Sequence, residues 1–545
     1  MYTRSDSPAM THDKKTRAHV PELLQQLGQP SAAGVDAVAR HTGVPAADVF
    51  GVESFYSLLD QRDLKTRVCT GLSCRLAGAE DLLKACDKAR LETAPTSCIA
   101  ACDRPPAMLR ERRVVCEVTT GDVLESQGSF EKLYSAAGSD WRGSIWPATA
   151  DEGESLLNLA AAPNWSAAGY AKALEIGPEA VIQALEEAGL QGRGGAGFPA
   201  HIKWSAVRGE AEPVKYIVLN GDEAEPGTFK DREIMLRRPD LVLDGLAIAA
   251  HAVGAGEVWL YLRGEFEIPR EIMERAVAAA EEEERYGDLA FHFHSGHGAY
   301  ICGEETALLE SLEGRRGMPR HKPPFPTAQG LWGKPTLIHN VETIALVPTI
   351  LLRGAEFFRQ AGKTQPGTKL YCLSGHVARP GVYEMPLGVS LDELVEAAGG
   401  YIGELKAFSP GGASSGFLPA SERARPLDFQ ALAEVDSMLG SAGVVVLNEG
   451  VNMAWAAAEQ LEFFERESCG QCAPCRIGTA YQRASLERFR EDGDAQALEH
   501  VDNIAWEMIE GSICGLGQTA SLPLTSALRH FPEDFVANSS GGAPQ

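Results

Sequence analysis

The last part of the sequence holds its clearest chemical signal. Cys469, Cys472 and Cys475 follow one another as C-x2-C-x2-C, and Cys514 comes later, in the segment SICGLGQ. Three thiolates at this spacing can hold one face of a cubane iron–sulfur cluster, which a distant fourth cysteine completes. A zinc ion also accepts four thiolates, but zinc ribbons more often use two separated C-x2-C pairs. The pattern therefore favours a [4Fe–4S] cluster over structural zinc.

A second group of cysteines lies near the start of the chain. Cys69 and Cys74 are spaced as C-x4-C, and Cys98 and Cys102 as C-x3-C. Two pairs on two loops suit the two irons of a [2Fe–2S] centre, because each iron takes two thiolates. This spacing is less diagnostic, so a zinc module and incidental buried cysteines remain alternatives to the cluster that we favour. The other cysteines are expected in apolar cores: Cys86, Cys116, Cys302 and Cys372.

A glycine-rich loop marks the middle of the chain. Gly192, Gly194 and Gly197 match G-x-G-x-x-G, but the loop follows a helical pattern rather than a strand, which contradicts a Rossmann motif. Backbone without side chains can instead let a flat ring or a phosphate approach closely. Taken alone, a tight surface turn explains this loop equally well.

Other polar side chains lie where such a ligand would need them. Glu304 and Glu305 open a predicted helix, although complementarity with the helix dipole is a sufficient reason for a Glu pair. The segment KPPFP offers Lys322 for a phosphate and Phe325 for stacking, with a proline-stiffened loop as the alternative. A further group follows the strand pattern YIVLN, at the position where α/β proteins bind ligands: Asn220, Asp222, Glu223 and Glu225.

Composition argues against several classes of protein. The net charge of −25 argues against binding to nucleic acid or an anionic membrane surface, because both require clustered Lys and Arg. No apolar run is long enough to span a bilayer, and the first residues lack the apolar core of a signal peptide. We therefore expect a cytoplasmic protein, in which the cysteines are ligands or core residues rather than disulfides.

The chain is expected to fold as several domains, because 545 residues are too many for one hydrophobic core. The alternation of helical and strand-like segments predicts a multidomain α/β protein. The expected divisions are a helical segment (1–62), a small strand–helix–strand unit (63–134), a linker (135–175), an α/β domain (176–365), a small β-rich domain (366–440) and a helical region around the late cysteines (441–545).

These motifs, in this order, resemble one family. From about residue 176 to about 535 the chain is similar to the NADH-binding flavoprotein subunit of respiratory complex I and to its relatives in NAD-reducing hydrogenases and NAD-dependent formate dehydrogenases. Residues 20 to about 120 separately resemble the thioredoxin-like [2Fe–2S] subunit of that complex, here fused in front. The motifs that carry the main resemblance are GRGGAGFPAHIKW, NGDEAEPGTFKDR, GAYICGEETALLESLEGRRG, KPPFP and ESCGQCAPCRIG.

The resemblance implies FMN, NAD(H), a [4Fe–4S] cluster and a [2Fe–2S] cluster as cofactors. It implies a thioredoxin-like fold for 63–134 and a β-grasp-like fold for 366–440. FMN would be held by residues of the glycine loop and of three later segments, with Tyr300 lining its pocket and Asn340 at its phosphate. The FMN set is Gly192, Gly194, Gly195, Gly197, Lys203, Asn220, Asp222, Gly303 and Glu304, and Glu223 is expected in the same pocket.

The resemblance also implies how NADH is held. Phe198 and Phe325 would sandwich the adenine, and Lys322 would reach the phosphates. Glu225 would lie near the nicotinamide and only position it, whereas Glu305 would accept hydrogen bonds from the adenosine ribose and so favour NAD over NADP. The chain departs from the family in three places: His339 where a second Asn is frequent, Ala206 where an aromatic is common, and a shorter gap between Cys74 and Cys98.

The expected function is that of a diaphorase subunit. A flavin accepts a hydride and releases electrons singly, as iron–sulfur clusters require, so electrons would pass between NAD+/NADH and the clusters through FMN. The fused N-terminal domain, RHKPPFP, SPGGASSGFLPAS and SICGLGQTAS resemble most the β subunit of a cytosolic NAD-dependent formate dehydrogenase. This implies a hetero-oligomer with a molybdenum or tungsten α subunit that carries further iron–sulfur clusters. The alternatives are a hydrogenase diaphorase, a fused complex I module and, outside the enzymes, a zinc-stabilised assembly scaffold.

Overall fold

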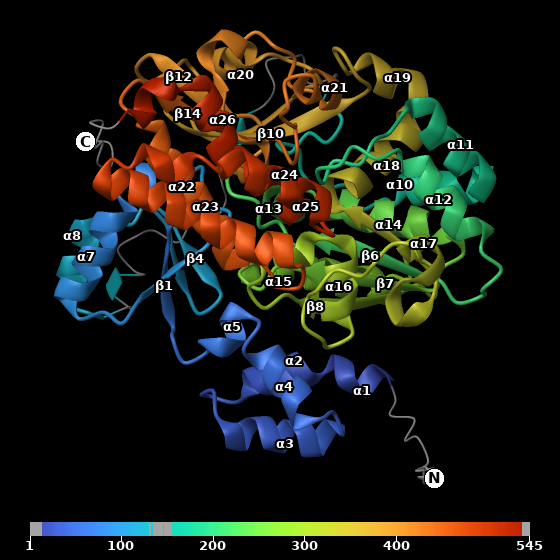
Figure 1. The fold of residues 1–545 in the computed structure, drawn as a ribbon. Helices are drawn as coiled ribbons and strands as arrows, with labels where there is room; N and C mark the ends of the chain where they lie inside the picture. The colour runs from blue at the N-terminus through green and yellow to red at the C-terminus, as the bar shows by residue number, and fades with distance from the viewer. Residues whose placement is uncertain (1–13, 130–131, 134–144, 147–154, 537–545) are drawn as a thin grey trace, which may run out of the picture.

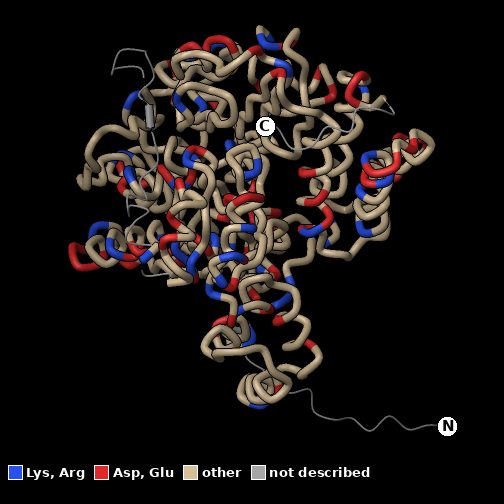
Figure 2. Tube along the Cα trace, turned by 90° about the vertical axis from the view of Figure 1, so that its left-hand side faces the viewer, with Lys and Arg blue, Asp and Glu red and all other residues tan. Residues whose placement is uncertain are grey.

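The computed structural model describes residues 14–129, 132–133, 145–146 and 155–536 (Figure 1). The predicted linker, 135–175, therefore falls partly outside the described residues. Acidic and basic residues are interspersed along the trace (Figure 2). Among the described helices, none is long and apolar enough to cross a membrane.

Five short helices at the N-terminus form a projection below the main body (Figures 1 and 2). The longest of them, α3, begins where the Ser31 hydroxyl accepts a hydrogen bond from the Gly34 amide, and ends at Gly43 in the left-handed conformation. The five are α1 (Lys14–Ala18), α2 (Val20–Gln26), α3 (Ala32–Thr42), α4 (Ala46–Glu53) and α5 (Ser57–Asp60).

The next unit is a four-stranded sheet in the order β2-β1-β3-β4. β1 pairs with β2 in parallel and with β3 antiparallel. The early cysteines lie at one end of this sheet, since Cys69 closes β1, Cys74 lies in α6, and Cys98 and Cys102 follow β2. The elements are β1 (Thr66–Cys69), α6 (Leu72–Leu76), α7 (Ala79–Ala89), β2 (Ala94–Thr96), β3 (Met108–Arg110), β4 (Arg113–Val115) and α8 (Thr120–Ser126).

The central domain is built on a parallel sheet in the order β8-β7-β6-β9. The most apolar segment of the chain forms α14, which is buried on nearly all sides and packs against α18. The strands are β6 (Tyr216–Gly221), β7 (Glu257–Leu262), β8 (Ala290–Ser295) and β9 (Thr336–Asn340). The helices are α10 (Ala168–Ile176), α11 (Pro178–Ala188), α12 (Ala200–Gly209), α13 (Lys230–Arg237), α14 (Pro239–Val253), α15 (Glu267–Glu282), α16 (Glu305–Leu312), α17 (Pro326–Gln329), α18 (Val341–Arg353) and α19 (Ala355–Gln360).

A second, mixed sheet follows, in the order β13-β12-β14-β10-β11-β5. Its β14 lies beyond the predicted boundary at residue 440, because the apolar run of β14 is a central strand between β10 and β12. The edge strand β5 comes from the segment predicted as a linker. The elements are β5 (Ile145–Trp146), β10 (Thr368–Gly375), β11 (Gly381–Pro386), α20 (Leu391–Ala397), β12 (Leu405–Ser409), β13 (Leu418–Pro419), α21 (Phe429–Ala433) and β14 (Gly443–Asn448).

The last unit is helical and crosses the front of the molecule in Figure 1, between the two sheet domains and the early cysteine unit. Cys472 immediately precedes α23, and Cys514 immediately precedes α25. The helices are α22 (Met453–Glu467), α23 (Ala473–Asp492), α24 (Val501–Gly511), α25 (Gly515–Thr519) and α26 (Leu522–His530). Three of the four late thiols are thereby placed at helix starts, and Cys469 follows the end of α22.

Candidate functional site

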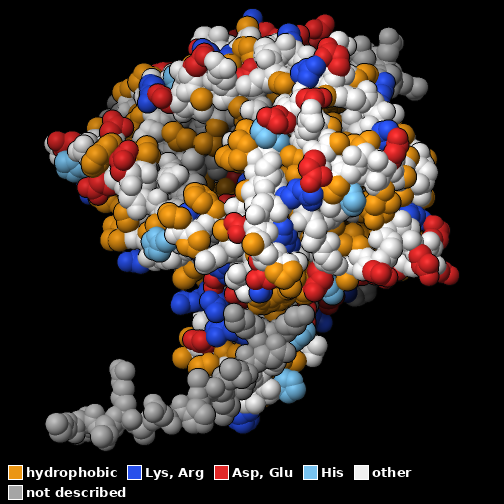
Figure 3. All heavy atoms as spheres, turned by 90° about the vertical axis from the view of Figure 1, so that its right-hand side faces the viewer, with side chains coloured by type: hydrophobic (Ala, Val, Ile, Leu, Met, Phe, Trp, Pro, Cys, Tyr) orange, Lys and Arg blue, Asp and Glu red, His pale blue; other side chains and the backbone are white. Residues whose placement is uncertain are grey.

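Two adjoining cavities lie at the carboxyl ends of the parallel strands β6 and β9. The outer cavity has a volume of about 600 Å3 and the inner one of about 500 Å3, and they share lining residues that include Asn220, Gly303 and Asn340. Figure 3, which faces the side of α12 and α17, shows a hollow with hydrophobic side chains around its edge.

All the residues predicted for FMN and NADH line one cavity or the other. Residues predicted for FMN line both cavities, those predicted for the adenosine half of NADH line the outer one, and Glu225, predicted near the nicotinamide, lines the inner one. The outer set is Gly192, Gly194, Gly195, Gly197, Phe198, Lys203, Asn220, Gly303, Glu304, Glu305, Lys322, Phe325 and Asn340. The inner cavity adds Asp222, Glu223, Glu225 and Tyr300.

The glycine loop runs between α11 and α12, after a helix as the sequence predicts. Gly197 has a φ of +63°, and a side chain there would strike the ring of Phe429 at 2.9 Å. A Cβ on Gly194 would lie 2.9 Å from the Cβ of Asn340. The bare backbone thus forms a close-fitting cradle beside Asn340, which fits the phosphate end of a flavin nucleotide.

Two lysines and two glutamates form a partly buried ion cluster in the outer cavity. The Lys203 and Lys322 ammonium groups each lie 2.8 Å from the Glu305 carboxylate, and Lys322 also lies 2.9 Å from Glu304. Burial by itself would raise the pKa of Glu305, but the two lysines outweigh it and lower the pKa to about 2. Glu305 is therefore an ionised acceptor at neutral pH.

Two phenyl rings stand at the mouth of the outer cavity. Phe198 is 46% exposed and Phe325 is 56% exposed, which is unusual for such large apolar side chains. Both also line the cavity, so they offer faces on which a planar ring can stack.

The loop after β6 contains a buried carboxyl oxygen without a hydrogen-bond partner. The Asn220 amide donates to the Gly303 carbonyl at 2.8 Å, and its oxygen accepts from the Asp222 amide at 3.2 Å. The Oδ2 atom of Asp222 is buried without a hydrogen-bond partner, and burial raises the pKa of this carboxyl well above its usual range. A buried acceptor without a donor fits a ligand that brings its own N–H or O–H.

Glu225 is held by residues from two other segments of the chain. The Tyr300 hydroxyl donates to its carboxylate at 2.5 Å, and the Ser414 amide donates to it at 2.8 Å. Burial raises the pKa of Glu225, and these donors oppose that rise. Ser414 belongs to the segment SPGGASSGFLPAS, which the sequence singled out as a resemblance but not as part of the site.

A buried ion network behind Asn340 was also missed. The Lys230 ammonium lies 2.7 Å from Asp231 and 3.0 Å from Glu342. The Asn340 amide nitrogen donates to Asp231 at 2.6 Å, and Lys230 donates to the Asn340 oxygen at 3.2 Å. This network fixes which way the amide of Asn340 points. In the sequence Lys230 and Asp231 look like surface residues of a helix.

Two predicted positions have structural partners. The Glu223 carboxylate accepts hydrogen bonds from the amides of Asp231 and Arg232 at 2.8 and 3.0 Å, so it caps the start of α13. His339, where the family often has Asn, accepts a hydrogen bond from the Trp204 indole at 2.8 Å. Burial lowers the pKa of His339 to about 3, so this imidazole is neutral and able to accept.

The four early cysteines converge in a closed site. Cys69, Cys74, Cys98 and Cys102 are at most 3% exposed, and the sulfurs of Cys98 and Cys102 are 3.4 Å apart. The thiols of Cys74 and Cys98 hydrogen-bond that of Cys69 and, together with burial, raise its pKa well above the usual range. Four thiols as near neighbours are the donor set that a [2Fe–2S] centre needs.

The late cysteines form a second, more open site. Cys469 and Cys472 are partly exposed, whereas Cys475 and Cys514 are buried. Burial and the neighbouring thiols raise the pKa of Cys475 to about 12, and burial raises that of Cys514 to about 11. In the described part of the chain, no three His, Cys, Asp or Glu side chains are grouped to hold a single metal ion. The late donor set, one thiolate for each iron, is that of a [4Fe–4S] cluster.

The four cysteines expected in cores are buried: Cys86, Cys116, Cys302 and Cys372.

Family models match four parts of the chain in order. Residues 10–126 match the thioredoxin-like [2Fe-2S] ferredoxin, and 185–349 match the Nuo51 FMN-binding domain. Residues 370–418 match the SLBB domain, and 455–538 match the NADH-ubiquinone oxidoreductase-F iron-sulfur binding region. The predicted multidomain α/β fold and the predicted cofactors FMN, NAD(H), [4Fe–4S] and [2Fe–2S] are thereby confirmed.

Whole-protein comparisons agree. The chain is 46% identical over 377 residues to the F 2 subunit of the NADH-quinone oxidoreductase of Rhizobium meliloti, covering 67% of this chain and 90% of that protein. It is 44% identical over 376 residues to the F subunit of the NADH-quinone oxidoreductase of Rickettsia typhi, covering 66% and 89%. A chain of an NAD+-reducing [NiFe]-hydrogenase in the air-oxidized state matches with a TM-score of 0.84 and 31% identity, covering 96% of this chain and 94% of that one.

Proposed function

Because this chain belongs to the family of NADH-quinone oxidoreductase F subunits, diaphorase modules with FMN and iron–sulfur clusters, we propose that it is the NAD-reactive β subunit of a formate dehydrogenase. The observation that carries the NAD-reactive role is the gathering of all predicted FMN and NADH residues around two adjoining cavities. FMN, when bound, exchanges a hydride with NAD(H) and single electrons with clusters. The residues of this chain have to bind FMN and NAD(H), orient the two rings toward each other and enclose them.

The outer cavity suits the adenosine half of NADH. Phe198 and Phe325 can stack on the two faces of the adenine, and Lys322 can reach the diphosphate. Glu305, ionised because its pKa is held at about 2, accepts hydrogen bonds from a ribose with free hydroxyls and repels a 2′-phosphate. The site therefore selects NADH over NADPH.

The inner cavity suits the flavin ring and the nicotinamide. Asn340, fixed by Lys230 and Asp231, and the bare loop beside it hold the phosphate end. Asp222 offers its unpaired oxygen to a donor on the bound ring. Glu225, already engaged by Tyr300 and Ser414, positions the nicotinamide rather than moving a proton.

The choice of a formate dehydrogenase rests on local sequence. The fused N-terminal domain, RHKPPFP, SPGGASSGFLPAS and SICGLGQTAS resemble the β subunits of those enzymes. The partner is then a molybdenum or tungsten subunit that oxidises formate and passes two electrons to this chain through further iron–sulfur clusters. The second candidate is a hydrogenase diaphorase, which is favoured by the match over 96% of this chain to the NAD+-reducing [NiFe]-hydrogenase.

The native complex decides between these partners. Metal analysis of the purified complex, together with formate- and H2-driven reduction of NAD+, should give Mo or W and formate activity. Nickel with H2 activity would replace the proposal by the hydrogenase, and quinone-linked membrane partners would replace it by a complex I module.

Nucleotide selection is tested by Glu305→Ala. This variant should lose most of its preference for NADH, by about 10-fold or more in the ratio of kcat/KM values, because a buried hydrogen bond to a charged group is worth roughly 1.5–3 kcal/mol. Glu310→Ala is the control, since Glu310 lies on the same helix but pairs with Arg320 at 2.5 Å. An unchanged preference in Glu305→Ala would refute the ribose contact.

A further inference from the structure

Two arginines of the central domain grip the loop that carries Cys98 and Cys102. The Arg263 guanidinium donates to the Cys98 carbonyl, and the Arg232 guanidinium donates to the Ala100 carbonyl. Arg232 also binds the Asp103 carboxylate with one nitrogen, at 3.1 and 3.2 Å from its two oxygens. The loop of one domain is thus held by cations that another domain supplies.

The same arginines are anchored in the loop after β6, which lines the inner cavity. Arg263 donates to the Glu223 carbonyl at 2.7 Å. The Glu223 side chain in turn accepts from the Arg232 amide at 3.0 Å. Glu223 of the inner-cavity loop therefore holds the Arg263 guanidinium through its carbonyl and the backbone of Arg232 through its carboxylate.

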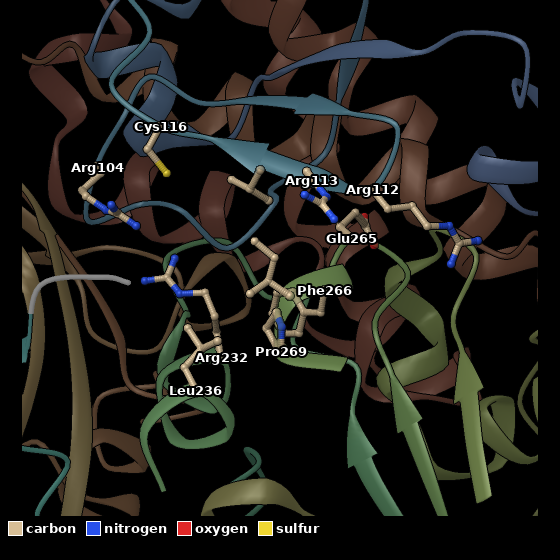
Figure 4. A pocket seen from close by; sticks show the side chains of 11 residues that line it. Arg104, Arg112, Arg113, Cys116, Arg232, Leu236, Glu265, Phe266 and Pro269 are labelled. Carbon is tan, nitrogen blue, oxygen red and sulfur yellow. The ribbon is translucent and has the colours of Figure 1, made fainter. Parts of the chain in front are cut away.

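The contact is largely buried, and Arg263 and Glu265 also line a cavity of about 590 Å3. Arg232 and Arg263 are 6% and 5% exposed. The space beside Arg232 is a pocket of only about 30 Å3, in which Arg104 and Cys116 come from the early cysteine unit and Arg232 and Phe266 from the central domain (Figure 4). Charges in such surroundings are weakly screened, so they act strongly on a neighbouring redox centre.

Carboxylates balance these cations. Arg263 pairs with Glu265 at 2.8 Å, and Arg232 pairs with Glu233 at 2.9 Å as well as with Asp103. Replacing either guanidinium by a neutral side chain removes one positive charge, whereas Glu233 keeps its pair with Arg237 and Asp103 lies 3.7 Å from Arg104. The local charge then becomes more negative by one unit, which disfavours an added electron.

We propose that Arg232 and Arg263 set the reduction potential of the [2Fe–2S] centre, so that the flavin domain decides how readily this cluster takes an electron. Oxidation of NADH to NAD+ releases two electrons and one proton. A [2Fe–2S] centre bound at the early cysteines would accept one of these electrons, and a [4Fe–4S] cluster bound at the late cysteines would accept the other. The two arginines act as positioning residues that hold positive charge against the ligand loop. This rests on the proposed assignment of Cys98 and Cys102 as ligands.

The test is an EPR-monitored redox titration of the full chain with its cofactors, in which the [4Fe–4S] signal serves as an internal reference. Arg232→Gln and Arg263→Gln should each shift the [2Fe–2S] midpoint downwards and leave the reference in place. Arg232→Lys and Arg263→Lys keep the charge and should stay close to the parent. Arg113→Gln is the control, because Arg113 bridges the same two domains at the surface, through Glu267 and Glu271.

Glu265→Gln covers the case in which a Gln variant of either arginine loses its cluster. It removes the negative charge that faces Arg263 with almost no change of shape, and it should shift the [2Fe–2S] midpoint upwards. The proposal is overturned if the [2Fe–2S] midpoint is unchanged in Glu265→Gln and in those Arg→Gln variants that fold. It is also overturned if the Lys variants of Arg232 and Arg263 shift the midpoint as much as the Gln variants do. If Cys98→Ala keeps the [2Fe–2S] signal, the ligand assignment has failed instead.

Discussion

The two cysteine sites differ in how much of each is closed to solvent. Cys98 and Cys102 are at most 3% exposed and lie where a sheet edge meets the central domain. Cys469 and Cys472 are partly exposed and lie in a loop before α23. The early, closed site is surrounded by charged residues of the central domain. The late, open site has partly exposed cysteines, at which another subunit could approach a bound cluster. We therefore expect electrons to pass to the partner from the late cluster.

The closed and open sites are also connected. Arg75, next to Cys74, pairs with Glu459 and Glu462 of α22 at 2.5 and 2.7 Å. The Ser97 hydroxyl donates to Glu467, which also accepts from the Tyr300 amide at 2.8 Å. The end of α22 therefore contacts the early cysteine loop, the wall of the inner cavity and the late cysteine loop together.

Removal of one ligand from each site gives the sharpest contrast. Cys475→Ala should lose the [4Fe–4S] signal, since a missing ligand lowers metal affinity by more than the roughly 10–100-fold that an outer contact contributes. NADH-driven transfer to the partner should stop, while reduction of an acceptor that takes electrons directly from the flavin persists. Iron content, EPR and both activities measure this.

Cys98→Ala is the matched variant in the closed site. It should lose only the [2Fe–2S] signal and keep most of the electron transfer to the partner. The reason is that we expect the [2Fe–2S] centre to store electrons beside the main path rather than to lie in it. If Cys98→Ala stops transfer as completely as Cys475→Ala, the [2Fe–2S] centre lies in the main path and the contrast between the sites disappears.

The sequence could predict the residues that carry chemistry because each lies in a short motif at an element's end. Asn220 and Asp222 end a strand, and the glycine loop and Glu304 precede helices, so parallel strands bring them to one edge. The residues that hold them could not be found in this way. Ser414 reaches Glu225 across 189 positions, and Arg263 reaches Cys98 across 165.

The sequence did not indicate which charged residues are buried. Arg232 and Lys230 lie in a helix with acidic neighbours, where a sequence predicts solvent-facing pairs. They are instead buried, because Lys230 pairs with Glu342 of the same domain and Arg232 pairs with Asp103 of the early cysteine unit. The β-rich domain also extends past its predicted end at residue 440. Its last strand, β14, pairs with β10 and β12, and such pairing between separate segments cannot be seen in the sequence.

Arg75→Leu tests whether the two cysteine regions stabilise each other. It leaves Glu459 and Glu462 close together without their shared cation, so unfolding should become easier by about 3–5 kcal/mol at neutral pH. Urea unfolding followed by tryptophan fluorescence would report this, because Trp455 lies in α22. Lys84→Leu is the control: its exposed pair with Asp81 should contribute no more than about 0.5 kcal/mol. Equal losses of unfolding free energy in the two variants would show that the Arg75 contact contributes no more than an exposed ion pair.

The smallest effect expected is a pH dependence at the same junction. Burial raises the pKa of Glu459 to about 7 from an ordinary value of 4.5, against the pull of Arg75. The folded chain thus binds this proton more tightly than the unfolded chain, so the stability it contributes is complete below about pH 4.5 and is lost as the pH rises through 7. The loss should reach about 3 kcal/mol, at 1.36 kcal/mol for each pKa unit.

Glu459→Gln isolates this contribution from other buried carboxyls. Glu223 has its pKa raised to about 7 and Asp244 to about 6, both mainly by burial, so the parent chain should lose stability over this range for several reasons. The difference between parent and Glu459→Gln, measured by urea unfolding at pH 5 and pH 7.5, contains only the α22 junction. We expect the variant to lose less stability over that interval, and identical losses would mean that solvent already reaches Glu459.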